Sequence, residues 1–446
     1  MNPVNRFFLV AAVCLAAIQS AFAAPLPAPA KGETIVFLGN GLPEREQNYG
    51  RWETEFHQRF PEANLVIRNM GYQGDTPAFR PRPGQPDQWA FTGAEEFRPE
   101  FKMHFGRGHY DKPDDWLKLV KADTIIAFFG FNESFDGPDH VDRFRAELTA
   151  FVKHTLGQQY NGRSAPKLVL ISPIAFEDRS KDYDLPKGDA ENENLALYTE
   201  AIRSVAGANN LTFVDLFSAS KRLYSRTRKP LTVNGSHLND DGYAATAEAL
   251  VEGIYGRGRH RAQAKDDLLH AAVQEKIWMW FNDYRMLNGV HVHGQRHRPY
   301  GNVNYPEEIE KIRQMTALRD QKIWDIAQGK TTDLAVDDST TRPLTPIETN
   351  FKREITYLDE QEALKKFTLL PGYEINLFAS ERDFPDMRNP VQMSFDNKGR
   401  LWVSVLHSYP HYVPGGTRPN DKILILEDTN GDGRADKQTV FVDGIS

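Results

Sequence analysis

The chain has 446 residues, which is too long for one ordinary hydrophobic core and predicts several domains. Its composition is 40% hydrophobic and 26% charged, with a formal net charge of -7. This balance is typical of a soluble protein and lacks the basic excess that holds a phosphate backbone, so nucleic acid is not an expected partner.

The N-terminus carries the pattern of a secretory signal peptide over residues 1–24. Arg6 precedes an apolar run from Phe7 to Ile18, and Ala21-Phe22-Ala23 follows as a small-residue cleavage pattern. The run is shorter than the roughly 20 residues that a membrane-spanning helix needs. We therefore expect an exported protein, periplasmic or extracellular, with no transmembrane helix in the mature chain. The only cysteine, Cys14, lies in this segment, so no disulfide or cysteine-ligated metal is expected after cleavage.

Residues 33–255 alternate short β-branched runs with longer amphipathic ones, which predicts a doubly wound α/β domain with a parallel sheet. The expected helices lie near residues 45–60, 140–156, 191–208 and 241–255. The expected strands read TIVFLG, NLVIRN, DTIIAFFG, KLVLISP and LTFVDL. A long insertion rich in proline, glycine and aromatic residues, 75–115, separates the second strand from the third. Such a loop either covers a functional site or is a surface elaboration.

Residues 260–330 contain two segments with apolar residues at helical spacing, which predicts a helical hairpin. His291, His293 and His297 lie at its tip, where neutral imidazoles at close spacing can share a metal ion. No carboxylate or thiolate lies between them, so a polar loop tip is the favoured interpretation.

A polar linker, 331–366, precedes a β-rich segment, 367–446, in which YEINLFA, VQMSFDNKGRLWVSV and KILILEDTNGDGRADKQTVFV read as strands. Turn signals at 397–399 and 431–433 predict a β-meander. The segment has too few strands to bury both faces of a sheet, so we expect it to be the truncated start of a larger β domain.

Polar and glycine signals follow several strands of the α/β domain, where parallel sheets place their sites. They read GNG after the first strand, RNMGYQGDT after the second and GFNES after the third, with VNGSHLNDDGY before the last helix. These four blocks resemble those of the SGNH, or GDSL-type, hydrolase family over residues 33–255. The resemblance implies a three-layer flavodoxin-like fold and a hydrolase acting on ester bonds, without a cofactor.

Residue by residue, the resemblance places Gly71 and Asn132 at the oxyanion positions and His237 at the catalytic histidine. Gly41 stands where the family has its serine nucleophile, Asn40 where aspartate is usual, and Asn234 where the orienting aspartate belongs. Acyl transfer by this route needs a hydroxyl whose proton the imidazole can take, and glycine has none.

Ordinary serine-esterase activity is therefore not expected, although Gly71, Asn132 and His237 could still bind an acyl or carbohydrate group or activate water. The opposing interpretation is that Asn132 only fixes a loop and that His237 flanks a helix without a chemical role. We expect Gly41, Asn132 and His237 to line one pocket, with Asn40 beside them. The expected ligand is a small-molecule or carbohydrate ester.

Residues 367–446 carry a second resemblance, to the first blades of propeller "membrane-bound dehydrogenase" proteins of the Planctomycetes and Verrucomicrobia group. That family often has a haem-binding C-x-x-C-H module, and no such motif occurs in this sequence. Asp428, Asn430, Asp432 and Asp436 have the spacing of a calcium loop, but position 12 is Thr439. A weak calcium site and a simple Asp/Gly hairpin turn remain equal alternatives.

The prediction is thus an exported protein with a degenerate SGNH hydrolase-like domain, a helical hairpin and a partial β-propeller. Two other functions stay open. The α/β domain could be a non-catalytic module that binds acylated carbohydrate, or the chain could be the N-terminal part of a propeller sugar-dehydrogenase-like haem protein.

Overall fold

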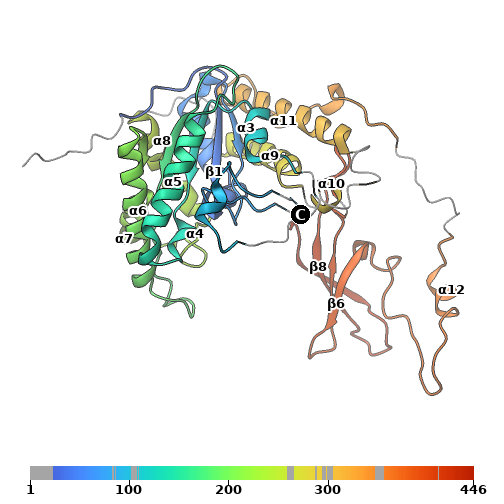
Figure 1. The fold of residues 1–446 in the computed structure, drawn as a ribbon. Helices are drawn as coiled ribbons and strands as arrows, with labels where there is room; N and C mark the ends of the chain where they lie inside the picture. Colours follow the sequence, from blue (N-terminus) through green and yellow to red (C-terminus); the bar gives the residue numbers. More distant parts are fainter. Residues whose placement is uncertain are drawn as a thin grey trace, which may run out of the picture.

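The computed structural model describes residues 24–82, 85, 87–101, 108, 110–258, 266–286, 289–293, 298, 305–346, 356–409 and 411–445. The expected signal peptide, with Cys14, lies outside these residues apart from Ala24. Figure 1 shows three regions in chain order: the α/β domain, the helical hairpin and a C-terminal sheet. No helix among the described residues is long and apolar enough to cross a membrane.

The α/β domain is built on a parallel sheet in the order β2-β1-β3-β4-β5, as expected for a flavodoxin-like fold. Strand order reverses next to β1, so the loops after β1 and β3 diverge at the carboxyl edge and leave room for a site. The strands are β1 (Thr34–Gly39), β2 (Val66–Asn69), β3 (Thr124–Phe128), β4 (Lys167–Ile171) and β5 (Thr212–Val214).

Helices cover both faces of this sheet, because its strands are buried on both sides. One face packs against α3 (Pro113–Leu119), α5 (Val141–Leu156) and α6 (Asp189–Ala208), with a core that includes Trp116, Phe144 and Tyr198. The other packs against α2 (Arg51–Arg59) and α8 (Asp240–Tyr255), through Trp52 and Tyr243. The shorter helices are α1 (Gly41–Glu46), α4 (Phe131–Ser134) and α7 (Leu216–Arg226).

The predicted hairpin is confirmed as α9 (Asp266–Tyr284) and α11 (Tyr305–Ala327), with the short α10 (Gly289–Val292) near its tip. It covers the open edge of β2. The outward carbonyls of Leu65, Ile67 and Asn69 accept hydrogen bonds from Trp324 Nε1, Lys276 Nζ and Trp280 Nε1 respectively. The hairpin therefore satisfies edge groups that would otherwise face solvent or another strand.

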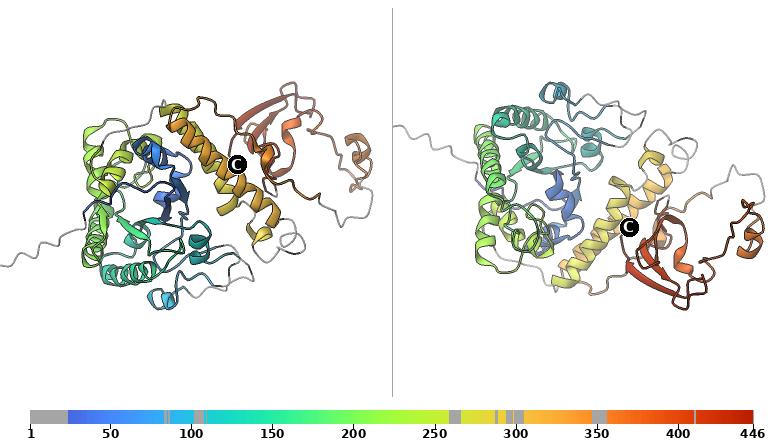
Figure 2. Two further views of the ribbon diagram at one scale, coloured as in Figure 1. Left: turned by 90° about the horizontal axis from the view of Figure 1, so that it is seen from above. Right: turned by 90° about the horizontal axis from the view of Figure 1, so that it is seen from below.

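The C-terminal region forms the expected meander, an antiparallel sheet in the order β6-β7-β8-β9. Its strands are β6 (Pro390–Phe395), β7 (Leu401–Val405), β8 (Lys422–Glu427) and β9 (Lys437–Val442), and the short helix α12 (Glu360–Leu364) precedes them. Figure 2 shows the hairpin lying between this sheet and the α/β domain. His411 Nε2 lies 2.6 Å from Glu308 of α11, and Tyr412 packs with Met279, Ile312 and Met315.

Three details differ from the sequence prediction. The helix expected over 45–60 is split into α1 and α2, because the chain turns at Gly50, which has a left-handed φ of 69°. The strand expected over 373–379 is absent; Phe378 accepts a single backbone hydrogen bond from Ala435. Helices α3, α4, α12 and α7 were also not predicted: the first three are short, with seven, four and five residues, and α7 has eleven residues directly after β5.

Candidate functional site

The end of β1 places Asn40 and Gly41 at the carboxyl edge of the sheet, where α1 begins. The Asn40 backbone N–H donates to the Phe128 carbonyl at 3.2 Å, which ties this turn to β3. The Asn40 side chain is 1% exposed, and its Nδ2 has no hydrogen-bond partner. An amide N–H buried without an acceptor is costly, so this donor is available to a ligand at little further cost.

His237 faces Gly41 across the site. A Cβ atom added to Gly41 would lie 3.8 Å from His237 Nε2 and 3.8 Å from Gln73 Cγ, with nothing nearer. The φ of Gly41 is not in the left-handed region. A serine side chain therefore fits here, with its hydroxyl within reach of the imidazole, and the family alignment of these two positions is geometrically consistent.

The imidazole of His237 is oriented by its neighbours in the loop before α8. Its Nδ1 lies 3.0 Å from Asn234 Oδ1 and 2.9 Å from Ser236 Oγ. Burial, with a smaller contribution from the charge of Arg45, lowers the pKa of His237, so the ring is neutral at neutral pH. Because Asn234 Oδ1 only accepts, Nδ1 carries the proton and the lone pair of Nε2 faces Gly41. That is the geometry of a general base without its usual hydroxyl partner.

The two expected oxyanion donors are already engaged. Gly71 N–H donates to Asn69 Oδ1 at 2.9 Å. Asn132 Nδ2 donates to the backbone carbonyls of Gln73 at 2.8 Å and Asp75 at 3.1 Å. Asn132 thus fixes the loop after β2, which agrees with the more conservative interpretation of that residue. Their oxyanion roles remain predictions and would require these hydrogen bonds to be exchanged for a ligand.

A narrow pocket joins the expected residues only in part. Its volume of ≈ 10 Å³ holds about one water molecule. Gly41, Asn40 and His237 line it as expected, but the prediction that Asn132 lines the same pocket is wrong, and Gly71 does not line it either. Asn132 instead binds the carbonyl of Gln73, whose Cγ would lie 3.8 Å from a Cβ at Gly41. The other lining residues are Leu42, Phe128, Phe129, Phe131, Ser172, Pro173, Ile174 and Ser236.

Ser236 and Phe131 were not singled out from the sequence. Ser236 directly precedes His237, and its Oγ bonds to Nδ1 of that ring. Phe131 directly precedes Asn132, and its ring stacks edge-on against the imidazole at 5.8 Å. Their adjacency to the expected site residues was the available signal.

No group of three or more His, Cys, Asp or Glu side chains suited to a metal ion occurs in the described ranges. At the hairpin tip, His297 lies outside those ranges. His293 packs edge-on against Tyr110 at 4.9 Å, and burial lowers its pKa to about 4.

In the possible calcium loop, the Asp428 carboxylate accepts hydrogen bonds from the backbone N–H groups of Gly431 and Gly433. This turn is therefore closed by its own hydrogen bonds, and a calcium role for Asp428, Asn430, Asp432 and Asp436 remains a prediction.

Comparison with protein families identifies a GDSL-like lipase/acylhydrolase domain at residues 35–245 and a domain of unknown function, DUF7133, at residues 359–446. Among solved structures, the chain is similar to an acetylxylan esterase from Geobacillus stearothermophilus, with 17% identity, 53% of this chain and 100% of the esterase covered, and a TM-score of 0.35. It is also similar to an α/β hydrolase from the metagenome of Lake Arreo, Spain, with 18% identity, 52% and 98% covered, and a TM-score of 0.36. No curated protein matches the chain.

Proposed function

We propose that the GDSL-like domain at residues 35–245 binds a small acyl ester, of the acylated-carbohydrate class, without hydrolysing it through a serine. The observation that carries this proposal is the glycine at position 41, placed directly opposite Nε2 of His237. A base faces the position of the nucleophile, and the nucleophile is missing. The pocket around that position keeps Asn40 and His237 in its wall.

Recognition of the acyl group would rest on two polar atoms. The unpaired Nδ2 of Asn40 can donate to a carbonyl oxygen, and Nε2 of His237 can accept from a hydroxyl group of the ligand. Apolar side chains, including Leu42 and Phe131, supply the remaining wall. The small volume and the space left by the absent serine side chain favour an acetyl group over a longer acyl chain.

Two features oppose efficient hydrolysis. Without a hydroxyl at position 41, no acyl-enzyme can form at this position. Asn234 can orient the imidazole but lacks the charge that stabilises imidazolium, a change that costs on the order of 10⁴ in rate in serine proteases. Direct activation of water by His237 is the remaining hydrolytic route, and Asn40 Nδ2 would be its single free oxyanion donor among the expected site residues, because Gly71 and Asn132 are engaged.

The signal-peptide pattern of residues 1–24 supports export to the periplasm or the outside of the cell. The four-stranded antiparallel meander of residues 390–442 has the architecture of one propeller blade, which supports a propeller origin for the C-terminal region. In that case, the acyl-binding domain would be joined to a propeller module.

The test uses the mature parent protein, p-nitrophenyl acetate and three variants. We expect the parent to hydrolyse the ester no faster than His237→Ala. The double variant Gly41→Ser/Asn234→Asp should gain at least about 100-fold, because it restores both the hydroxyl and the charge behind the imidazole. Gly41→Ala is the matched control, since it adds the same Cβ without the hydroxyl, and it should gain nothing.

Binding is tested separately by saturation-transfer NMR with a monoacetylated methyl glucoside. Asn40→Leu should weaken binding about fivefold or more, since it removes the free donor. Hydrolysis by the parent well above His237→Ala would contradict the non-hydrolytic proposal, and unchanged binding by Asn40→Leu would contradict the assigned pocket.

A further inference from the structure

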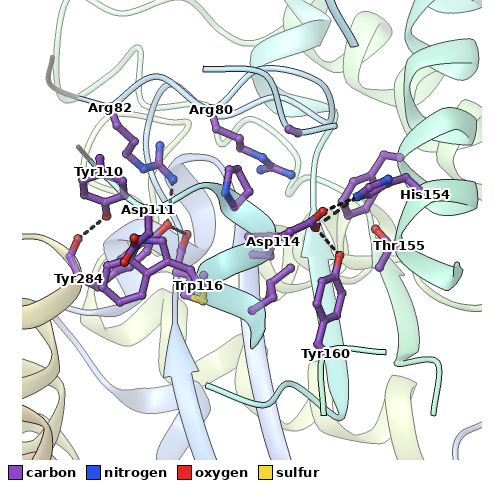
Figure 3. Close-up of a pocket in the computed structure, with 16 residues that line it drawn as sticks. Arg80, Arg82, Tyr110, Asp111, Asp114, Trp116, His154, Thr155, Tyr160 and Tyr284 are labelled. Carbon is purple, nitrogen blue, oxygen red and sulfur yellow. Dashed lines mark hydrogen bonds and ion pairs between the residues drawn. The ribbon is translucent and has the colours of Figure 1, made fainter. Parts of the chain in front are cut away.

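A second cavity lies on the α5 side of the sheet, beneath the insertion of residues 75–115 and against α9 of the hairpin (Figure 3). Its volume is ≈ 20 Å³, about twice that of the pocket beside His237. The two pockets share no lining residue. Described residues of the insertion therefore line a separate cavity, and the question is whether that cavity is a functional site.

The insertion delivers two buried arginines to this cavity. Arg82, 7% exposed, donates to both oxygens of Asp75 and to the Tyr284 hydroxyl. Arg80, 2% exposed, makes one longer contact with Asp75 at 3.3 Å, and its Nε has no partner. Figure 3 shows its guanidinium extending towards the side of the cavity that carries Asp114, His154 and Tyr160.

A second unsatisfied donor lines the same cavity. Trp116 is 1% exposed, and its Nε1–H has no hydrogen-bond partner. Buried donors in folded proteins usually have an acceptor, which can be a protein group, a water molecule or a ligand, so these two donors can bind an acceptor that enters the cavity. The cavity also carries an acceptor, because Asp114 binds Tyr160 Oη and His154 Nε2 but keeps a side chain that is 26% exposed.

The charged residues around this cavity indicate which kind of ligand it can bind. Arg80 and Arg82 share Asp75, and Asp111 and Asp114 lie in the same wall, so the carboxylates match or outnumber the guanidinium groups. A bound anion would be repelled by the negative charge of Asp114, and the wall has no surplus of positive charge to offset this repulsion. A neutral hydroxyl group can accept from Arg80 or Trp116 and donate to Asp114 at the same time. Aromatic rings such as Tyr110 and Tyr160 supply apolar faces for the carbon atoms between hydroxyl groups.

We propose that this cavity binds a neutral polyhydroxylated small molecule, the diol end of a polyol or sugar, between Trp116 Nε1, Arg80 Nε and the Asp114 carboxylate. The small volume favours such an end over a complete sugar ring. The site is independent of the acyl pocket, so it stands whether or not that pocket binds an ester.

Glycerol and methyl glucoside are the probes, with sodium acetate as the anionic comparison at matched ionic strength. Titration of the full chain, followed by NMR, should give polyol binding with a dissociation constant on the order of millimolar, as expected for a few hydrogen bonds to a small ligand. Trp116→Phe should weaken glycerol binding about fivefold, because it removes the indole donor and keeps an aromatic ring. Trp402→Phe, the same change in the C-terminal sheet, is the matched control and should leave glycerol binding unchanged.

Asp114→Asn provides a second test at a partly exposed position that folding tolerates more readily. It should weaken glycerol binding and leave acetate binding unchanged or stronger, since a negative charge is removed. Acetate binding in preference to both polyols, or polyol binding that neither Trp116→Phe nor Asp114→Asn weakens, would overturn the proposal.

Discussion

Two glycines of the α/β domain, Gly41 and Gly71, illustrate opposite constraints at the scale of single residues. A Cβ at Gly71 would lie 2.5 Å from the Glu44 backbone nitrogen and 2.9 Å from Glu44 Cα, whereas a Cβ at Gly41 meets nothing closer than 3.8 Å. Gly71→Ala should therefore lower the free energy of unfolding by about 1–3 kcal/mol, because α1 must move. Gly41→Ala should change it by less than about 1 kcal/mol. Urea unfolding of both variants gives the comparison, and equal effects would contradict it.

The sequence resemblance placed Gly41 and His237 correctly opposite each other, because strand ends and the loop before the last helix converge in this fold. The resemblance could not predict that the N–H donors of Gly71 and Asn132 form hydrogen bonds within the protein. Those bonds depend on Asn69 and on the path of the loop at Gln73, which no pattern of residue types specifies. Likewise, no pattern reveals that the Asn40 amide is left without a partner.

Glu133, next to Asn132 in α4, should make stability depend on pH. Burial, together with repulsion from Glu147, raises its pKa from 4.5 to about 8. Between these values the folded state keeps a proton that the unfolded state has released, so stability falls as pH rises through this window. Glu133→Gln keeps an acceptor for the Gly130 N–H, now made at 2.7 Å, and removes the titration.

From pH 5 to pH 8.5, the parent should lose on the order of a few kcal/mol of unfolding free energy more than Glu133→Gln. Urea unfolding at both pH values measures the difference. Parallel pH profiles for the two proteins would show that Glu133 is not held protonated in the folded state.

At the scale of elements, the hairpin takes the place of a further strand at the edge of β2. Lys276 is fully buried, and its Nζ donates to Glu53 at 2.6 Å and to the Ile67 carbonyl at 2.9 Å. Lys276→Met should lower the unfolding free energy by about 3–5 kcal/mol, because it leaves the Glu53 carboxylate buried beside His57 alone. The double variant Glu53→Gln/Lys276→Met should recover part of that loss. A cycle of urea unfolding measurements checks both, and additive losses would contradict the coupling.

Most elements were predictable because their signal is local. Strands of the parallel sheet read as β-branched runs, and α5, α6, α8, α9 and α11 show helical spacing over several turns. Where the prediction was wrong, the structure depends on tertiary contacts. Residues 373–379 have strand-forming side chains, but they have no neighbouring strand to pair with beyond one bond to Phe378. The docking of the hairpin on the carbonyls of Leu65, Ile67 and Asn69 also had no sequence signal.

At the scale of the whole molecule, the hairpin joins the two other regions. One side binds β2 through Trp324, Lys276 and Trp280. Another contacts the C-terminal region, where Tyr412 packs on α9 and α11 and His411 pairs with Glu308. The hairpin is therefore not a separate appendage. A change in the packing of the hairpin should therefore affect both sides, at the loop after β2 and at the connection between β7 and β8.

The unstrained backbone at Gly41 also determines which point mutations of the gene the fold can accommodate. Serine codons AGT and AGC differ by one nucleotide from glycine codons GGT and GGC, and each asparagine codon differs by one nucleotide from an aspartate codon. The fold keeps an unobstructed position for the serine side chain, within reach of His237. A gene with such codons lies two point mutations from a complete Ser-His-Asp set, and the polypeptide sets no steric barrier along that path. A serine at position 41 is thus a change that the scaffold itself can accommodate.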